Sequence, residues 1–64
     1  MSRDLERVER KAAELRRAQD AVDRRREDLI AAVEYAADAG VSEYALATAA
    51  GVARGTIRKW LGKD

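Results

Sequence analysis

The first 39 residues contain neither proline nor glycine, and this absence constrains the fold more than any other feature. Ala, Arg, Glu and Leu dominate the stretch and are strong helix formers, so nothing interrupts a helix from Ser2 to about Ala39. Ser2 is a suitable N-cap, and Gly40 is a suitable C-terminal stop. Such a helix would be about 57 Å long, which is more than this short chain can wrap in its own core. Part of it must therefore project.

The projecting part carries a coiled-coil seam. Seam residues follow one another at alternating steps of three and four, which is typical of heptads, and with Leu5 at position a the series continues through Gln19 and Arg26 to Val33 and Ala36. Burying a large seam side chain in a partner contributes about 1.5 to 3 kcal/mol, whereas a lone helix gains nothing from the stripe. A charged single helix and a membrane-surface helix are weaker alternatives. We therefore expect residues 1–28 to be a dimerisation arm whose seam is Leu5, Val8, Ala12, Leu15, Gln19 and Val22.

Charges beside the seam bear on the direction of pairing. In a parallel pair Asp4 faces Glu9 and Lys11 faces Arg16, so both contacts join like charges. An antiparallel pair centred between positions 12 and 15 brings Glu9 near Arg16 and Asp4 near Arg25, and holds the two C-terminal bundles roughly 80 Å apart. Each pair contributes well under 1 kcal/mol, and glutamines stacked at position 19 favour the parallel register. The antiparallel direction is favoured, and the parallel one stays open.

From Leu29 the pattern changes. The apolar stripe widens through Ile30, Val33 and the alanines at 36 and 37 into the broad face of a globular helix. Ser42 can cap a second helix from Glu43 to about Ala50, Gly51 supplies a turn, and a last helix runs from about Arg54 to Leu61. No strand pattern is present. The expected fold class is all-α: a long N-terminal helix forms a coiled-coil arm and continues into a three-helix helix-turn-helix bundle of residues 29–64.

The residues around Gly51 have steric roles that fit a helix-turn-helix. Ala47, four residues earlier, must be small because the next helix crosses close above it, and Gly51 permits a tight reversal. Val52 enters the core after the turn, while Ile57 and Trp60 pack the last helix onto the preceding one. Trp60 is expected to be a core anchor rather than a base-stacking platform. The side left for a partner is formed by Ala53, Arg54, Gly55, Arg58 and Lys59.

At this point the sequence resembles the helix-turn-helix family of bacterial and phage DNA-binding proteins, which includes regulators and the DNA-binding domains of resolvases and transposases. The resemblance covers residues 43–62, where LATAAGVARGTIRKWL has the small-residue, Gly-Val, Thr-Ile and Trp-Leu pattern. It departs at Ala53, because the family often has a capping Ser there. The resemblance implies double-stranded DNA as partner, with the last helix in the major groove. It implies base contacts from Arg54, Gly55, Arg58 and Lys59, and phosphate contacts from Ser42, Thr56 and Lys63.

The charge distribution supports this interpretation better than the net charge of +1 does. Residues 53–63 carry four cations and no acid, and we expect the exposed face around them to lack a neutralising carboxylate. A second basic run, at residues 24–26, is flanked by Asp23, Glu27 and Asp28, so we expect a solvated or seam-edge role for it.

Composition makes an enzyme the weakest of the other function classes. Without His or Cys, acid/base or nucleophilic chemistry would fall to carboxylates that lie beside cations, so we expect no enzyme, and no cofactor or metal site. No apolar run approaches the roughly 20 residues of a membrane span, so we expect a cytoplasmic, nucleoid-associated protein. The expected function is that of a dimeric, sequence-specific DNA-binding protein, a small transcriptional regulator. The alternatives are a recombination or excision accessory protein, and a coiled-coil assembly factor whose terminal bundle binds protein.

Overall fold

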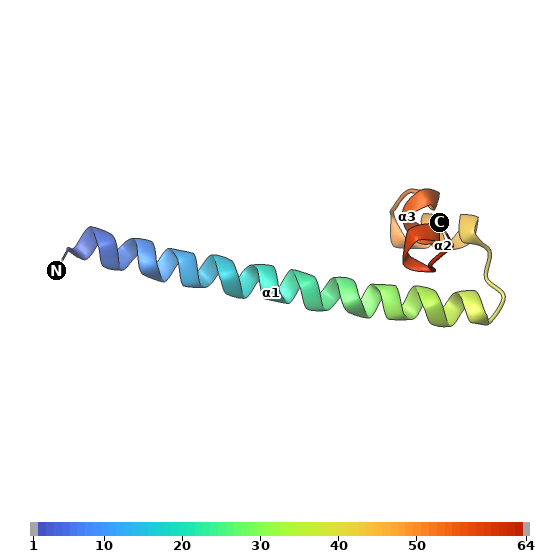
Figure 1. Cartoon of the computed structure of the whole chain (residues 1–64), viewed down its shortest axis with the longest axis horizontal. Coiled ribbons are helices and arrows are strands. Elements are labelled where there is room, and N and C mark those ends of the chain that lie inside the picture. Colours follow the sequence, from blue (N-terminus) through green and yellow to red (C-terminus); the bar gives the residue numbers. More distant parts are fainter. Residues whose placement is uncertain (1, 64) are drawn as a thin grey trace.

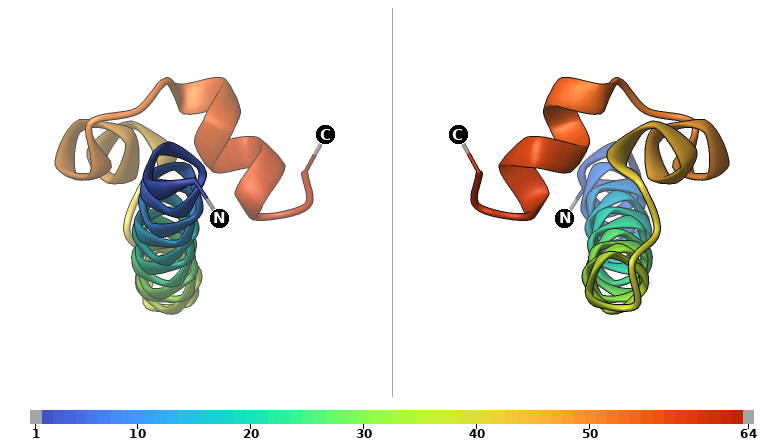
Figure 2. Two further views of the ribbon diagram at one scale, coloured as in Figure 1. Left: turned by 90° about the vertical axis from the view of Figure 1, so that its left-hand side faces the viewer. Right: turned by 90° about the vertical axis from the view of Figure 1, so that its right-hand side faces the viewer.

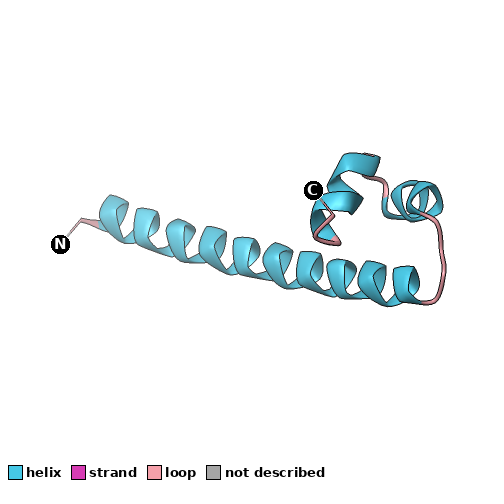
Figure 3. Cartoon of the chain, turned by 45° about the vertical axis from the view of Figure 1, so that its right-hand side comes forward, coloured by secondary structure: helices cyan, strands magenta, loops and turns pink. Residues whose placement is uncertain are grey.

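The computed structural model describes residues 2–63 and contains three helices. These are α1 (Arg3–Asp38), α2 (Glu43–Ala50) and α3 (Arg54–Trp60), and the described residues contain no strand (Figure 3). The all-α class is therefore confirmed. The outer ends of the two predicted domains, Met1 and Asp64, lie outside the described residues.

Helix α1 has the bounds that its sequence predicts. The Ser2 hydroxyl oxygen accepts a hydrogen bond from the backbone N–H of Leu5 at 3.3 Å, and acidic residues occupy the first turn beside the positive end of the helix dipole. At the other end Gly40 has a φ of 97°, and the N–H of Val41 donates to the carbonyl of Ala36 at 3.1 Å, which ends the helix. The 36 residues of α1 span most of the 59 Å length of the molecule (Figure 1).

Helices α2 and α3 form a small head over the C-terminal part of α1, and the end-on views of Figure 2 place them on opposite sides of its axis. The Ser42 hydroxyl caps α2 by accepting from the N–H of Ala45 at 3.1 Å. Gly51 adopts the left-handed conformation, with a φ of 71°, and the chain reverses there as predicted. Helix α3 starts after Ala53, which makes no side-chain cap, and it ends at Trp60, one residue before the predicted end.

The core of the head is small but includes all three helices. Val33 of α1, Leu46 and Ala47 of α2 and Ile57 of α3 are buried, and Ile57 has no exposed surface at all. Half-buried side chains complete this core: Ala36, Ala37, Ala50, Val52, Trp60 and Leu61. The predicted packing role of Trp60 is confirmed. Leu29, expected in the core, keeps 36% of its surface exposed, because the head packs on α1 from Val33 onward.

The seam of the arm is exposed to solvent. Leu5, Val8, Leu15 and Val22 are 55% to 62% exposed, although they lie on one stripe of α1. The molecule exposes 5302 Å² in total. A compact monomer of this mass would expose roughly 4,100 Å², so the projecting arm accounts for a large excess of surface. Within residues 2–63, no helix is both long and apolar enough to cross a membrane.

Candidate nucleic-acid interface

The outer side of α3 is the face that the sequence predicts. Ile57 points into the core, while Arg54, Gly55 and Lys59 are exposed and Arg58 is half-buried. A Cβ atom built on Gly55 would meet no heavy atom within 4 Å, so packing inside the molecule does not require glycine there. The four predicted base-contact residues thus share an open surface, and their contact with DNA stays a prediction.

One expectation about this surface is wrong, because a carboxylate does lie among the cations. The Glu43 carboxylate accepts hydrogen bonds from Arg58 Nη1 at 3.0 and 3.1 Å and from Lys63 Nζ at 3.1 Å. Arg54 Nε lies 3.5 Å from the same group. Three of the four C-terminal cations therefore surround Glu43.

The fold explains this cluster. Glu43 is the first residue of α2, and the turn at Gly51 brings α3 and the segment after it back beside that end of α2. The partners of Glu43 follow it by 11 to 20 residues, so a count of charges along residues 53–63 could not include it. The signal available in the sequence is the acid at the first position of the helix that leads into the Gly51 turn.

The surroundings of Glu43 favour its charged form. Only 16% of its side chain is exposed, and the hydrogen bonds from Lys63 and Arg58 hold its pKa below the ordinary value of 4.5. Arg58 also donates to the carbonyl of Lys63 at 3.2 Å, which ties the chain after α3 to the same cluster. The cluster orders three long side chains that would otherwise be free.

The surface remains positive despite Glu43. Three cations contact one carboxylate, and a fourth, Lys59, is exposed on α3 beside Arg58 and takes part in no ion pair among residues 2–63. The Arg54 side chain is still 66% exposed, so it too can reach a partner. We call this surface, formed by Glu43, Arg54, Arg58, Lys59 and Lys63, the cationic cluster.

The three predicted phosphate contacts lie in different settings. Ser42 is exposed, but its hydroxyl oxygen serves as the cap of α2 and retains only its hydrogen for a donor role. Thr56 is half-buried in the first turn of α3, next to Gly55. Lys63 is exposed and belongs to the cationic cluster. The structure thus brings Lys63 together with Arg54 and Arg58 but engages Ser42 in folding.

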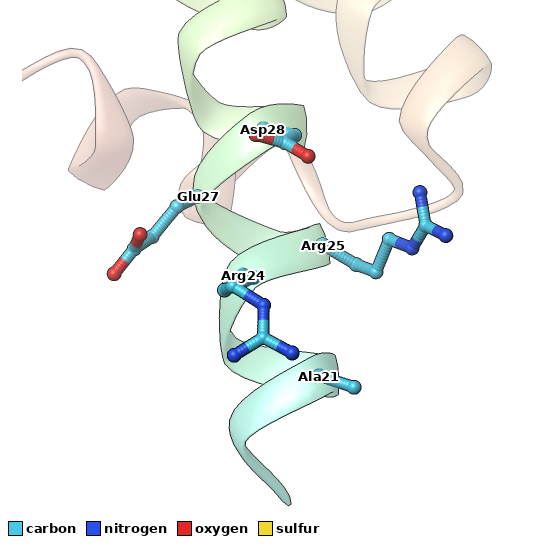
Figure 4. Close-up of a pocket in the computed structure, with 5 residues that line it drawn as sticks. All are labelled: Ala21, Arg24, Arg25, Glu27 and Asp28. Atoms are coloured by element: carbon cyan, nitrogen blue, oxygen red, sulfur yellow. The ribbon is translucent and has the colours of Figure 1, made fainter. Parts of the chain in front are cut away.

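The second basic run has the solvated setting that its neighbours predict. Figure 4 shows Arg24 and Arg25 extending away from α1, with the Glu27 and Asp28 side chains on the following turn. Arg26 Nη1 lies 3.8 Å from Asp23, and both side chains are mostly exposed. In residues 2–63 no three acidic side chains gather as metal ligands would.

Comparison of the chain with protein-family models, with curated proteins and with solved structures found no match.

Proposed function

We propose that the head binds double-stranded DNA through α3 and the cationic cluster, and that the chain acts as a small transcriptional regulator with two such heads joined by the arms. The observation that carries the proposal is the cationic cluster, in which three cations lie within 3.5 Å of the Glu43 carboxylate and a fourth, the exposed Lys59, follows Arg58 on α3. Phosphates attract such a surface over a wide area, and each contact releases counterions.

The shape of α3 supports the same partner. A helix whose inner side is held by Ile57 and whose outer side carries Arg54, Gly55 and Lys59 matches a helix that enters a major groove. The absence of any neighbour within 4 Å of the Gly55 position gives the DNA backbone or a base edge room to approach. In this arrangement the hydrogen bonds to Glu43 hold Arg58 and Lys63 in place before DNA arrives.

The competing proposal is a coiled-coil assembly factor whose head binds protein. The Glu43 contacts favour it, because they satisfy three of the cations inside the molecule. Lys59 and the surplus of positive charge are left unexplained by that alternative, and DNA binding accounts for both.

Alanine substitution on α3 tests the proposal. Arg58→Ala should weaken binding to a selected duplex by about 1 to 3 kcal/mol and relax the preference at one base position. Lys59→Ala breaks no ion pair among residues 2–63, and because it removes one positive charge it should reduce the slope of log K against log salt by about 1. The matched control is Arg17→Ala, which removes the same charge from an exposed position of the arm. Equal binding by the control and both head variants would remove the basis of the proposal.

A further inference from the structure

The exposed seam of α1 does not stop at the head but runs into an apolar groove. The groove has a volume of about 200 Å³ and lies between α1 and α2. Its lining is entirely aliphatic: Leu29, Ala32, Val33, Ala36, Leu46, Ala49 and Ala50. A second apolar hollow lies further along the same stripe, around Leu15 and Val22. Seam and groove together form one track along most of the molecule, which is apolar except at Gln19 and Arg26.

We propose that the occupant of this track is α1 of a second copy, antiparallel, with its first two turns in the groove. Two copies related in this way pair seam positions whose residue numbers add up to 41. Position a of one chain then always meets position d of the other, as in Ala12 with Leu29 and Gln19 with Val22. This inference builds on association through the arm and does not depend on DNA binding.

The extent of the track supports this register. Four of the large seam side chains are more than half exposed, and Leu29 is 36% exposed. In the proposed pair all five face the partner chain. The surface in excess of a compact monomer is about 1,200 Å², which exceeds the roughly 800 Å² that each partner contributes to a standard interface.

The groove explains how the ends of the pair fit. Val33 is already buried by the head, so the partner's Val8 cannot pack on it directly. The groove opens beside Val33, and two of the residues that line the groove, Leu29 and Ala49, are exposed. The partner's Leu5 and Val8 would fill this space as a third helix packed against α1 and α2.

Charge complementarity agrees with the proposed register. In an antiparallel pair, e positions face e positions and g positions face g positions. The proposed register sets Arg16 opposite Asp23 of the partner, twice by symmetry, and makes no contact between like charges. Asp23 lies 3.8 Å from Arg26 in its own chain, so Arg16 would join an existing pair.

The other registers are less favourable. A shift of one heptad sets Arg16 against Arg16, Glu9 against Asp23 and Lys11 against Arg25, all of like charge. A shift of two heptads is the arrangement favoured by charges alone, centred between positions 12 and 15. It leaves Leu29 and the groove uncovered, and exposed ion pairs stabilise less than the burial of such apolar surface. The groove therefore moves the expected centre to between Gln19 and Val22.

This register also changes the spacing of the heads. Val33 of one chain lies level with position 8 of the other, so the two Val33 residues are about 38 Å apart along the pair axis. That separation is close to the 34 to 36 Å between adjacent half-sites on one face of DNA. By the same measure, the register centred between positions 12 and 15 holds the two Val33 residues about 59 Å apart, which would suit more widely separated sites.

Cysteine pairs in the full-length chain test the register without DNA. The double variant Ala12→Cys/Leu29→Cys should oxidise to a covalent dimer in which position 12 is joined to position 29 of the partner. Each single variant should remain uncrosslinked, and so should Leu5→Cys/Val22→Cys, which reports the register centred between 12 and 15. Efficient crosslinking of Leu5→Cys alone requires parallel arms and would overturn the proposal, as would efficient crosslinking of the Leu5/Val22 pair.

A charge placed in the groove tests the occupant. Ala49→Glu should raise the dissociation constant of the dimer at least tenfold in sedimentation equilibrium. Thr48→Glu is the matched control, because Thr48 is the adjacent exposed residue of α2 and does not line the groove. Equal dissociation constants for the two variants would show that the groove is empty in the dimer.

A wild-type chain that sediments as a monomer would mean that the track is not covered by a second copy. Neither an empty groove nor a monomeric chain would prevent one head from binding DNA. Failure of this proposal is therefore distinguishable from failure of the proposed function.

Discussion

Replacing Glu43 by glutamine removes the only carboxylate of the cationic cluster. The glutamine keeps an oxygen that can accept a hydrogen bond. The structure shows Arg54, Arg58 and Lys63 within 3.5 Å of this group. If these cations meet phosphates, Glu43→Gln raises the positive charge of the interface by one. Binding to a duplex should therefore become tighter at low salt.

The magnitude follows from counterion release. One additional effective phosphate contact steepens the slope of log K against log salt by about 0.9. Between 50 and 200 mM salt, the variant should lose about 3.5-fold more affinity than the wild type. Fluorescence anisotropy of a labelled duplex, titrated at several salt concentrations, measures both slopes.

The matched control is Glu34→Gln, which makes the same change of net charge at an exposed site of α1 outside the cluster. Its slope should stay close to that of the wild type. If Glu34→Gln and Glu43→Gln shift the slope equally, the effect is one of overall charge, and the cationic cluster is not the interface. If Glu43→Gln weakens binding, its role in orienting Arg58 and Lys63 outweighs its charge.

Three further outcomes are expected. Ile57→Ala, which truncates the fully buried side chain of the four-residue core, should destabilise the head by about 2 to 5 kcal/mol, measured by Trp60 fluorescence during urea unfolding. Gly55→Ala should stabilise the fold by about 0.4 to 1 kcal/mol but weaken duplex binding, and a variant that binds as well as the wild type would show that no DNA group approaches Gly55. Because the pKa of Glu43 is lower in the folded state than the ordinary 4.5, its ion pairs stabilise the head fully above pH 4.5 and progressively less as the pH falls below it. Thermal melting of the wild type should show this loss, and melting of Glu43→Gln should lack that component.

Much of the fold could be predicted because local signals determine it. Ser2 and Ser42 cap their helices, and Gly40 and Gly51 adopt positive φ values at the predicted ends. The inward position of Ile57 follows from helical periodicity. These caps and turns depend on residues no more than five apart in sequence. The rest of the chain is not needed to form them.

The candidate site was less predictable because it depends on segments that are distant in sequence. Glu43 meets Lys63 only after two helices and a turn have formed, so the charge pattern near the C-terminus gave the wrong expectation. The groove beside Leu29 likewise depends on where α2 lies over α1. Periodicity along α1 identifies the seam, but it does not show where the head covers it.

The salt dependence of duplex binding by the wild-type chain tests the central claim most directly. If the cationic cluster binds phosphates, the slope of log K against log salt should be roughly −2 to −4 per head, corresponding to two to four phosphate contacts. An affinity for duplex DNA that is undetectable at 50 mM salt, or that does not change between 50 and 200 mM, would contradict the proposal that the head is a DNA-binding unit.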